Sequence, residues 1–203
     1  MADTAGRTRD DVDTARPGPR LLVQLAGAPG SGKTRLARAL ATRTGAAVLN
    51  SDIVKSTLLD AGVLWSVAGP AAYQTLFALA DDLLGQDHDV LLDSPSHYAF
   101  IPDSGRRIAA GRGARYRFVE CACADPAELR RRLAGRTPMR SQMRDLDQPP
   151  PDADAPPTAI RLGEHRWQTF GPPDGHLVVD TCGPFEPVLE RVLGFVLGDP
   201  PGP

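Results

Sequence analysis

Gly27-Ala28-Pro29-Gly30-Ser31-Gly32-Lys33-Thr34 matches the pattern G-x-x-x-x-G-K-[ST] at each of its fixed positions. An apolar run precedes it at 21–26, and a run of helix-favouring residues follows it at 35–41. This is the order of strand, loop and helix that the pattern requires. The stretch therefore predicts a phosphate-binding loop rather than a glycine-rich turn that happens to precede a helix.

The residue types of this loop explain why it would bind a nucleotide. Its glycines allow a tight turn in which successive backbone N–H groups point inward at a helix N-terminus, where negative charge is favoured. Lys33 is then expected to contact the β- and γ-phosphates, and Thr34 to bind Mg²⁺. We therefore predict ATP and Mg²⁺ as cofactors, with all of 27–34 as nucleotide-binding residues.

Length and composition favour a single globular domain. The chain has 203 residues, of which 41% are hydrophobic and 24% are charged. These values are ordinary for a soluble protein with a substantial core. The formal net charge of −2 provides no overall positive field that would attract nucleic acid.

The sequence also predicts a cytoplasmic location without membrane attachment. No apolar run is long enough to span a bilayer, and the polar first 20 residues do not resemble a signal peptide. The three cysteines, Cys121, Cys123 and Cys182, lack metal-ligand or C-x-x-C spacing. We expect them to be reduced and buried, as is usual in cytosolic proteins.

Apolar runs alternate with helical patterns along the rest of the chain. Strands are predicted at 21–26, 46–49, 88–93, 114–123 and 176–180, and helices at 33–43, 53–60, 69–84, 104–111, 126–136 and 185–197. The alternation predicts an α/β fold with a parallel sheet covered by helices on both faces. Tyr73 and the other apolar residues of the helix at 69–84 are expected in the core.

Asp52 is the first candidate for catalysis. It follows the predicted strand at 46–49, and ligands in open α/β sheets bind beyond the carboxyl ends of the strands. Asp52 should therefore face the same crevice as Lys33, with Lys55 one helical turn later as a substrate contact. Asp is also a favoured N-cap residue, so a purely structural role for Asp52 is an alternative.

A second acidic residue ends the next predicted strand. Asp93 closes the run at 88–93, and this position is typical of a carboxylate that orients the Mg²⁺ shell. The polar loop that follows offers Ser94, Ser96 and His97 as candidate contacts to the acceptor. The alternative for His97 is an ordinary loop histidine.

Arginines cluster after the fourth predicted strand. Arg132 and Arg136 are four residues apart, so they share a helix face if the helix extends that far. Arg140 and Arg144 continue the basic character. A run of charged residues usually forms a solvent-exposed face. Phosphoryl transfer, however, needs movable cations to neutralise charge on the transferring group. We predict an arginine-rich lid in which Arg132 and Arg136 are catalytic, Arg132 also binds the nucleotide, and Arg140 binds the substrate.

The remaining segments carry weaker signals. The Pro-rich stretch at 148–157 predicts an extended, mobile link. Residues 158–170 have no confident assignment. We expect a disordered leader at 1–19, a kinase domain at 20–198 with its lid and insertion near 132–160, and a short tail at 199–203.

These residues together resemble the small P-loop kinases. The features are the phosphate loop, Ser51-Asp52 with a basic residue three positions later, Asp93 ending a strand, Arg132-x-x-x-Arg136, and Val179-Asp180-Thr181 before the last helix. The resemblance is closest to the branch that contains polynucleotide 5′-kinases, zeta-type toxins, chloramphenicol phosphotransferase and gluconate kinases. It implies a three-layer α/β/α fold with five parallel strands in the order 2-3-1-4-5.

The resemblance also implies transfer of the ATP γ-phosphate to a hydroxyl group, with Asp52 as the general base. The polynucleotide kinases have D-x-x-R after the second strand, whereas this chain has Lys55, which cannot form a bidentate fork with phosphate. We therefore expect a small-molecule acceptor: an antibiotic or other secondary metabolite, a nucleoside or a sugar. The alternatives are a polynucleotide 5′-kinase, a zeta-type toxin acting on a sugar nucleotide, and a regulatory ATPase without an acceptor.

Overall fold

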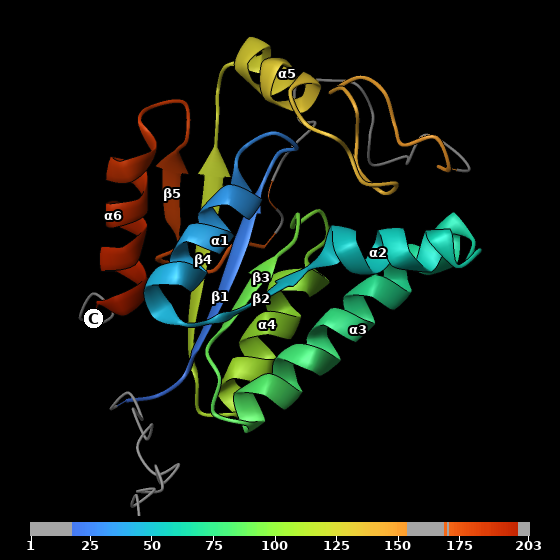
Figure 1. Ribbon diagram of the computed structural model, residues 1–203. Helices are drawn as coiled ribbons and strands as arrows, with labels where there is room; N and C mark the ends of the chain where they lie inside the picture. Colours follow the sequence, from blue (N-terminus) through green and yellow to red (C-terminus); the bar gives the residue numbers. More distant parts are fainter. Residues whose placement is uncertain (1–17, 154–168, 170, 199–203) are drawn as a thin grey trace, which may run out of the picture.

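The computed structural model describes residues 18–153, 169 and 171–198 (Figure 1). The elements, in chain order, are β1 (Leu21–Gly27), α1 (Lys33–Thr44), β2 (Ala47–Asn50), α2 (Ser51–Asp60), α3 (Trp65–Gly85), β3 (Val90–Asp93), α4 (Phe100–Gly111), β4 (Arg115–Ala122), α5 (Pro126–Ala134), β5 (Leu177–Asp180) and α6 (Phe185–Leu197). The predicted leader at 1–17, the tail at 199–203 and most of the unassigned segment lie outside the described residues.

The five strands form one parallel sheet in the order β2-β3-β1-β4-β5. This confirms the predicted fold and strand order. Successive side chains of β1 point to opposite faces of the sheet, as the two-residue repeat of a strand requires. Val23 and Leu25 pack with α1 and α6, whereas Leu22 packs with α3 and α4. Figure 1 shows these two helical layers on either side of the sheet.

Local signals in the sequence explain where α1 ends and where α5 begins. Gly45 ends α1 with φ 75°, and its N–H donates to the carbonyl of Ala41, as expected for a left-handed cap. Asp125 caps α5, where its carboxylate accepts from the N–H of Ala127 at 2.9 Å, and Pro126 occupies the first turn. Both helix ends thus carry residue types that are common at these positions.

Three predicted helix boundaries are wrong. Helix α3 begins at Trp65, so Pro70 lies inside it rather than at its start. Helix α4 begins at Phe100 instead of Ser104. Helix α5 ends at Ala134, so Arg136 lies beyond the helix and does not share its face with Arg132.

The segment after α5 folds back onto the domain. Leu146 packs against Leu129 and Leu133 of α5, and Pro150 is buried. The N–H of Ala153 donates to the carbonyl of Pro150, so the described part of the Pro-rich stretch contains a turn and is not a fully extended link. In the described ranges, no helix is long and apolar enough to cross a membrane.

Candidate active site

A cavity of about 1020 Å³ lies beyond the carboxyl ends of the strands. Its walls come from the phosphate loop, α2, α3, the loop after β3, α5 and the loop after β5. Pockets that hold a drug-sized ligand usually enclose about 300–1,000 Å³. This cavity is therefore at the upper end of the range for ligand pockets.

The phosphate loop has the backbone conformation that its glycines permit. Gly27 has φ 136°, and a Cβ atom there would lie 2.2 Å from the carbonyl oxygen of Cys121 on β4. Gly32 has φ 87° and directly precedes α1. Both positions disfavour any residue with a side chain, so the loop can pass close to β4 and open at the helix N-terminus.

Lys33 lies at the floor of this loop. Its ammonium group donates to the carbonyl oxygens of Gly27 at 2.7 Å and Ala28 at 2.9 Å. Burial lowers the pKa of Lys33, and the nearby charge of Asp93 partly opposes this change. A phosphate group would supply the negative charge that two neutral carbonyls do not.

Thr34 and Asp93 meet directly. The Thr34 hydroxyl donates to Oδ2 of Asp93 at 2.6 Å, and the Asn50 amide donates to the same oxygen. Asp93 is 3% exposed, and burial raises its pKa. A hydroxyl and a carboxylate next to a phosphate loop are oxygen ligands of the type that Mg²⁺ prefers, so these residues fit that ion. No cluster of three or more His, Cys, Asp or Glu suited to a metal occurs in the described ranges.

Asp52 faces the cavity from the first turn of α2, and Asn50, not Asp52, caps that helix. The Asn50 side chain accepts from the N–H groups of Asp52 at 2.8 Å and Ile53 at 3.1 Å. The Asp52 carboxylate instead accepts from Nε2 of Gln142 at 2.8 Å and from the hydroxyl of Ser141 at 3.3 Å. The capping alternative for Asp52 is therefore wrong.

Ser141 and Gln142 were not predicted as site residues. Two hydrogen bonds join Ser141 to Ser56 of α2. The N–H of Ser141 donates to the Ser56 hydroxyl at 3.0 Å, and the two hydroxyls are 2.9 Å apart. This contact brings Gln142 to Asp52 from 90 residues away in the sequence. No motif marks either residue, so only the fold reveals them.

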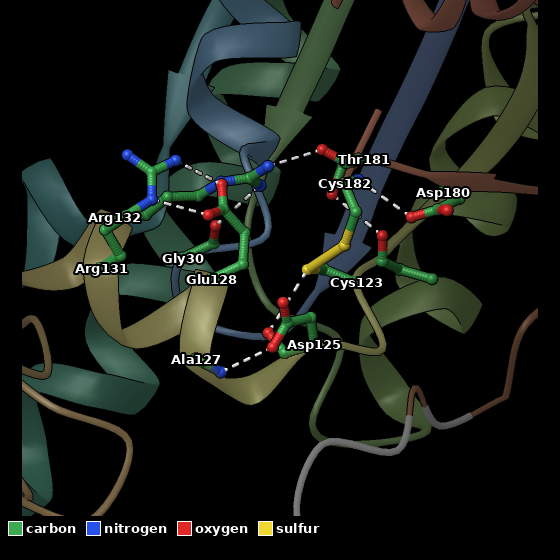
Figure 2. Close-up of polar contacts among 11 residues, drawn as sticks. Gly30, Cys123, Asp125, Ala127, Glu128, Arg131, Arg132, Asp180, Thr181 and Cys182 are labelled. Carbon is green, nitrogen blue, oxygen red and sulfur yellow. Dashed lines mark hydrogen bonds and ion pairs between the residues drawn. A yellow bond between two sulfur atoms is a disulfide. The ribbon is translucent and has the colours of Figure 1, made fainter. Parts of the chain in front are cut away.

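Arg132 connects three parts of the site, as Figure 2 shows. Its guanidinium donates to Glu128 at 2.6 Å, to the carbonyl of Thr181 at 2.6 Å and to the carbonyl of Gly30 at 3.4 Å. Hydrogen bonds from Arg131 and Arg132 lower the pKa of Glu128 to about 2. Arg132 is thus held at the junction of the phosphate loop and the loop after β5.

Arg136 also lines the cavity, although it lies beyond the end of α5. It donates to the carbonyl of Met143 at 2.9 Å, while its buried Nε has no hydrogen-bond partner in the described part of the chain. Burial lowers the pKa of Arg136. A buried donor without a partner favours an anionic ligand at this position.

The other predicted substrate contacts divide into two groups. Lys55 and His97 line the cavity. Ser94 and Ser96 are buried, 1% and 2% exposed, and are not part of the cavity wall. Arg140 points elsewhere, because its guanidinium pairs with Asp152 at 2.7 Å and donates to the carbonyl of Leu59.

Five aromatic residues on the cavity wall were not predicted as site residues. Trp65 and Tyr73 come from α3, Tyr98 from the loop before α4, Phe100 from the start of α4, and Phe185 from the start of α6. Tyr73 had been expected in the core, where its α3 neighbour Leu76 indeed lies. The helical repeat places Tyr73 near the face of α3 that packs into the core. Whether its side chain reaches the cavity depends on how the loop after β3 packs, which the repeat does not show.

The prediction of three reduced, buried cysteines is also wrong. Cys121 is buried and free, whereas Cys123 and Cys182 form a disulfide with their Cα atoms 5.5 Å apart (Figure 2). The register of the sheet is the reason. Ala122 pairs with Asp180, so the residues just after β4 and β5 are neighbours despite a separation of 59 positions.

His97 gives a testable pH dependence. Burial and the charge of Lys33 lower its pKa to about 4 from 6.5. Between these two values the unfolded chain holds a proton on this imidazole that the folded protein does not. The free energy of unfolding should therefore fall as the pH decreases from 6.5 to 4, by up to about 3 kcal/mol from this group.

We expect His97→Gln to remove that part of the acid sensitivity. Denaturant titrations at several pH values between 4 and 7 would measure it, with His88→Gln, at an exposed position before β3, as the matched control. Equal slopes for wild type and His97→Gln would contradict the prediction.

Comparison with known proteins identifies the family. The family model described as AAA domain matches residues 22–148. The chain belongs to this family. Proteins of Mycobacterium tuberculosis and Mycobacterium bovis that are uncharacterised are 30% identical over 178 residues. The match covers 81% of this chain but 32% of each relative, so the chain spans about a third of their length.

Solved structures with a similar fold include small P-loop kinases. A candidate kinase from Chloroflexus aurantiacus superposes with TM-score 0.65 at 21% identity, covering 88% of this chain and 97% of that one. A sugar kinase from Janibacter gives TM-score 0.59 at 17% identity, covering 89% and 95%. The APS kinase of Mycobacterium tuberculosis, solved with AMPPNP and APS, gives 0.57 at 19%, covering 90% and 100%. The fold is therefore that of the small P-loop kinases.

Proposed function

We propose that this protein is an ATP-dependent kinase that transfers the γ-phosphate to a hydroxyl group of a small molecule. The observation that carries the proposal is the position of Asp52. Its carboxylate lines the same cavity as the phosphate loop, Lys33 and the Thr34–Asp93 pair. A carboxylate there can act on an acceptor hydroxyl while the phosphate loop holds the donor.

In this mechanism Asp52 takes the proton of the acceptor hydroxyl as the oxygen attacks the γ-phosphorus. A bond forms between that oxygen and phosphorus, and the bond to the bridging oxygen of ADP breaks, with its electron pair leaving on ADP. Gln142 and Ser141 hold the carboxylate in place through their hydrogen bonds. Lys33, Arg132 and Arg136 offset the charge that develops on the phosphoryl group.

Thr34 and Asp93 would hold Mg²⁺, which supplies charge neutralisation on the phosphates. The Asn50 amide keeps the Asp93 carboxylate oriented toward Thr34. Because Asp93 is buried and its pKa is raised, a nearby cation would also keep it ionised at neutral pH. Asp93 is therefore a positioning residue for the ion.

A coupled assay tests the proposal directly. The purified chain is incubated with MgATP and a panel of hydroxyl compounds, and both ADP release and acceptor mass are measured. Acceptor-dependent ADP release with a mass gain of about 80 Da, one phosphoryl group, would support the kinase. Steady ADP release that no acceptor changes would instead favour a regulatory ATPase.

A further inference from the structure

The acceptor half of the cavity is poor in positive charge. Its walls come from α2, α3 and the loop after β3, and Lys55 is the only Lys or Arg between Thr44 and Arg106. Lys33 and Arg132 lie at the phosphate loop, whereas Arg136, on the segment after α5, is close enough to Asp52 for the two charges to interact. A phosphate or sulfate on the acceptor would need its own cations, preferably arginine forks.

The one cation of this wall is already engaged by a ring. The Lys55 ammonium lies 3.2 Å from the centroid of the Trp65 ring, which is a close cation–π contact. Burial lowers the pKa of Lys55 to about 8. An anionic acceptor would have to draw Lys55 away from Trp65, at the cost of that contact.

Aromatic rings form a second part of this wall. Tyr73 and Phe100 meet edge to face with ring centroids 5.8 Å apart, and Tyr98 stacks on Phe100 at 5.7 Å. The Tyr73 hydroxyl donates to the carbonyl of Pro95, so this ring is fixed in orientation. Tyr98 and Phe100 are 48% and 47% exposed, which leaves their faces available to a ligand.

From these observations we propose that the acceptor is an uncharged alcohol with an aromatic or otherwise flat apolar body. The rings hold that body while its hydroxyl reaches Asp52. Burial of apolar area, and stacking on Tyr98 and Phe100, supply the affinity. The proposal rests on the kinase function above and narrows its substrate class.

Calorimetric titration with three alcohols of similar size tests this acceptor class. In the presence of Mg²⁺ and AMPPNP, a phenylpropanediol should bind at least about tenfold more tightly than glucose or a sugar phosphate, because stacking adds to apolar burial. The Tyr98→Ala/Phe100→Ala variant should abolish the preference, and Tyr98→Phe, which keeps both rings, should retain most of it.

The outcomes distinguish the proposal on the acceptor class from the proposed kinase function. Tightest binding by the sugar phosphate, or an unchanged preference in the Tyr98→Ala/Phe100→Ala variant, would overturn the aromatic acceptor class. The kinase function is tested in the same samples with MgATP. Binding of the phenylpropanediol without any phosphoryl transfer to the panel would count against the kinase and not against the apolar wall.

The Cys123–Cys182 disulfide carries a second inference independently. Cys123 lies two residues before Asp125, the N-cap of α5, and Cys182 follows Thr181, whose carbonyl accepts from Arg132. Thr181 and Cys182 both line the cavity, and Cys182 is exposed. The bond thus joins the base of the helix that carries Arg132 to the loop that holds its guanidinium (Figure 2).

We infer that the redox state of this pair sets the affinity for nucleotide. In the reaction, a dithiol reductant attacks one sulfur, the S–S bond breaks, and a second exchange releases two cysteine thiols and the oxidised reductant. Two electrons and two protons pass to the protein. Thr181 is also bound to β4, because its N–H and its hydroxyl donate to the carbonyl of Ala122 at 2.8 and 2.9 Å. Without the disulfide, Cys182 is no longer joined to Cys123, so the loop after β5 positions the Thr181 carbonyl for Arg132 less firmly.

AMPPNP titrations of oxidised protein and of protein reduced with dithiothreitol test the inference. Reduction should weaken binding about tenfold, the effect of losing one charge-assisted hydrogen bond. The Cys123→Ser/Cys182→Ser variant should bind like reduced protein in both conditions, and Cys121→Ala should still respond. Equal or tighter binding after reduction, or three free thiols in the oxidised protein, would overturn the inference.

Discussion

Lys33→Ala is expected to lower kcat/KM for phosphoryl transfer by about three orders of magnitude, or about 4 kcal/mol of transition-state stabilisation. The Lys33 ammonium is the cation at the floor of the phosphate loop, within hydrogen-bond distance of the Gly27 and Ala28 carbonyls. Its loss leaves charge on the transferring group without its nearest counter-ion. Steady-state kinetics with the identified acceptor would measure the change.

The stability of Lys33→Ala should not fall together with its activity. The pKa of Lys33 is lowered because burial disfavours its charge, so removing the ammonium relieves a cost in the folded state. A thermal melt of Lys33→Ala close to that of wild type would separate chemistry from folding. Arg38→Ala, at an exposed position on the same helix, is the matched control and should keep full activity. Full activity in Lys33→Ala would refute the role of the phosphate loop.

Asp52→Asn is expected to lower kcat by a factor of about 10²–10⁴, the usual contribution of a general base. Asparagine has the same shape and can still accept a hydrogen bond from Gln142, so the site should remain folded. Its amide cannot take the proton of the acceptor hydroxyl. The KM for ATP should change little, because Asp52 lies on α2 and outside the phosphate loop.

Kinetics at saturating ATP and varied acceptor would separate these effects. Asp60→Asn, at the exposed far end of the same helix, is the control and should behave as wild type. Transfer by Asp52→Asn at a rate near wild type would show that Asp52 is not the base. A rise in the acceptor KM with kcat unchanged would assign Asp52 to binding alone.

The sheet illustrates how far local signals reach. Short apolar runs ending in polar residues predicted all five strands within a few residues, because buried parallel strands have few other sequence forms. The start of α3 was missed for a local reason. Proline is common in a first helical turn, which made Gly69-Pro70 look like the beginning of a helix. The helix instead starts at Trp65, and Pro70 lies past its first turn, where the missing N–H leaves one carbonyl without its partner.

The candidate site shows the same difference between features that the local sequence predicts and features that depend on tertiary contacts. The phosphate loop was readable because its chemistry is contained in eight consecutive residues, and the backbone torsion angles follow from their glycines. The position of Asp52 on the cavity wall could be predicted from its place after a strand. Its partners could not, since Gln142 approaches it from a loop with no motif of its own.

By itself, then, the sequence determined the phosphate loop, the parallel sheet and the edge of the sheet at which the cavity lies. The tertiary structure alone decided that Cys123 pairs with Cys182, that Arg140 turns away from the cavity, and that aromatic rings line the same cavity as Asp52. Local patterns act over one helix or strand. These contacts join residues tens of positions apart, and their geometry depends on the register of the sheet and on how the loops pack across its end.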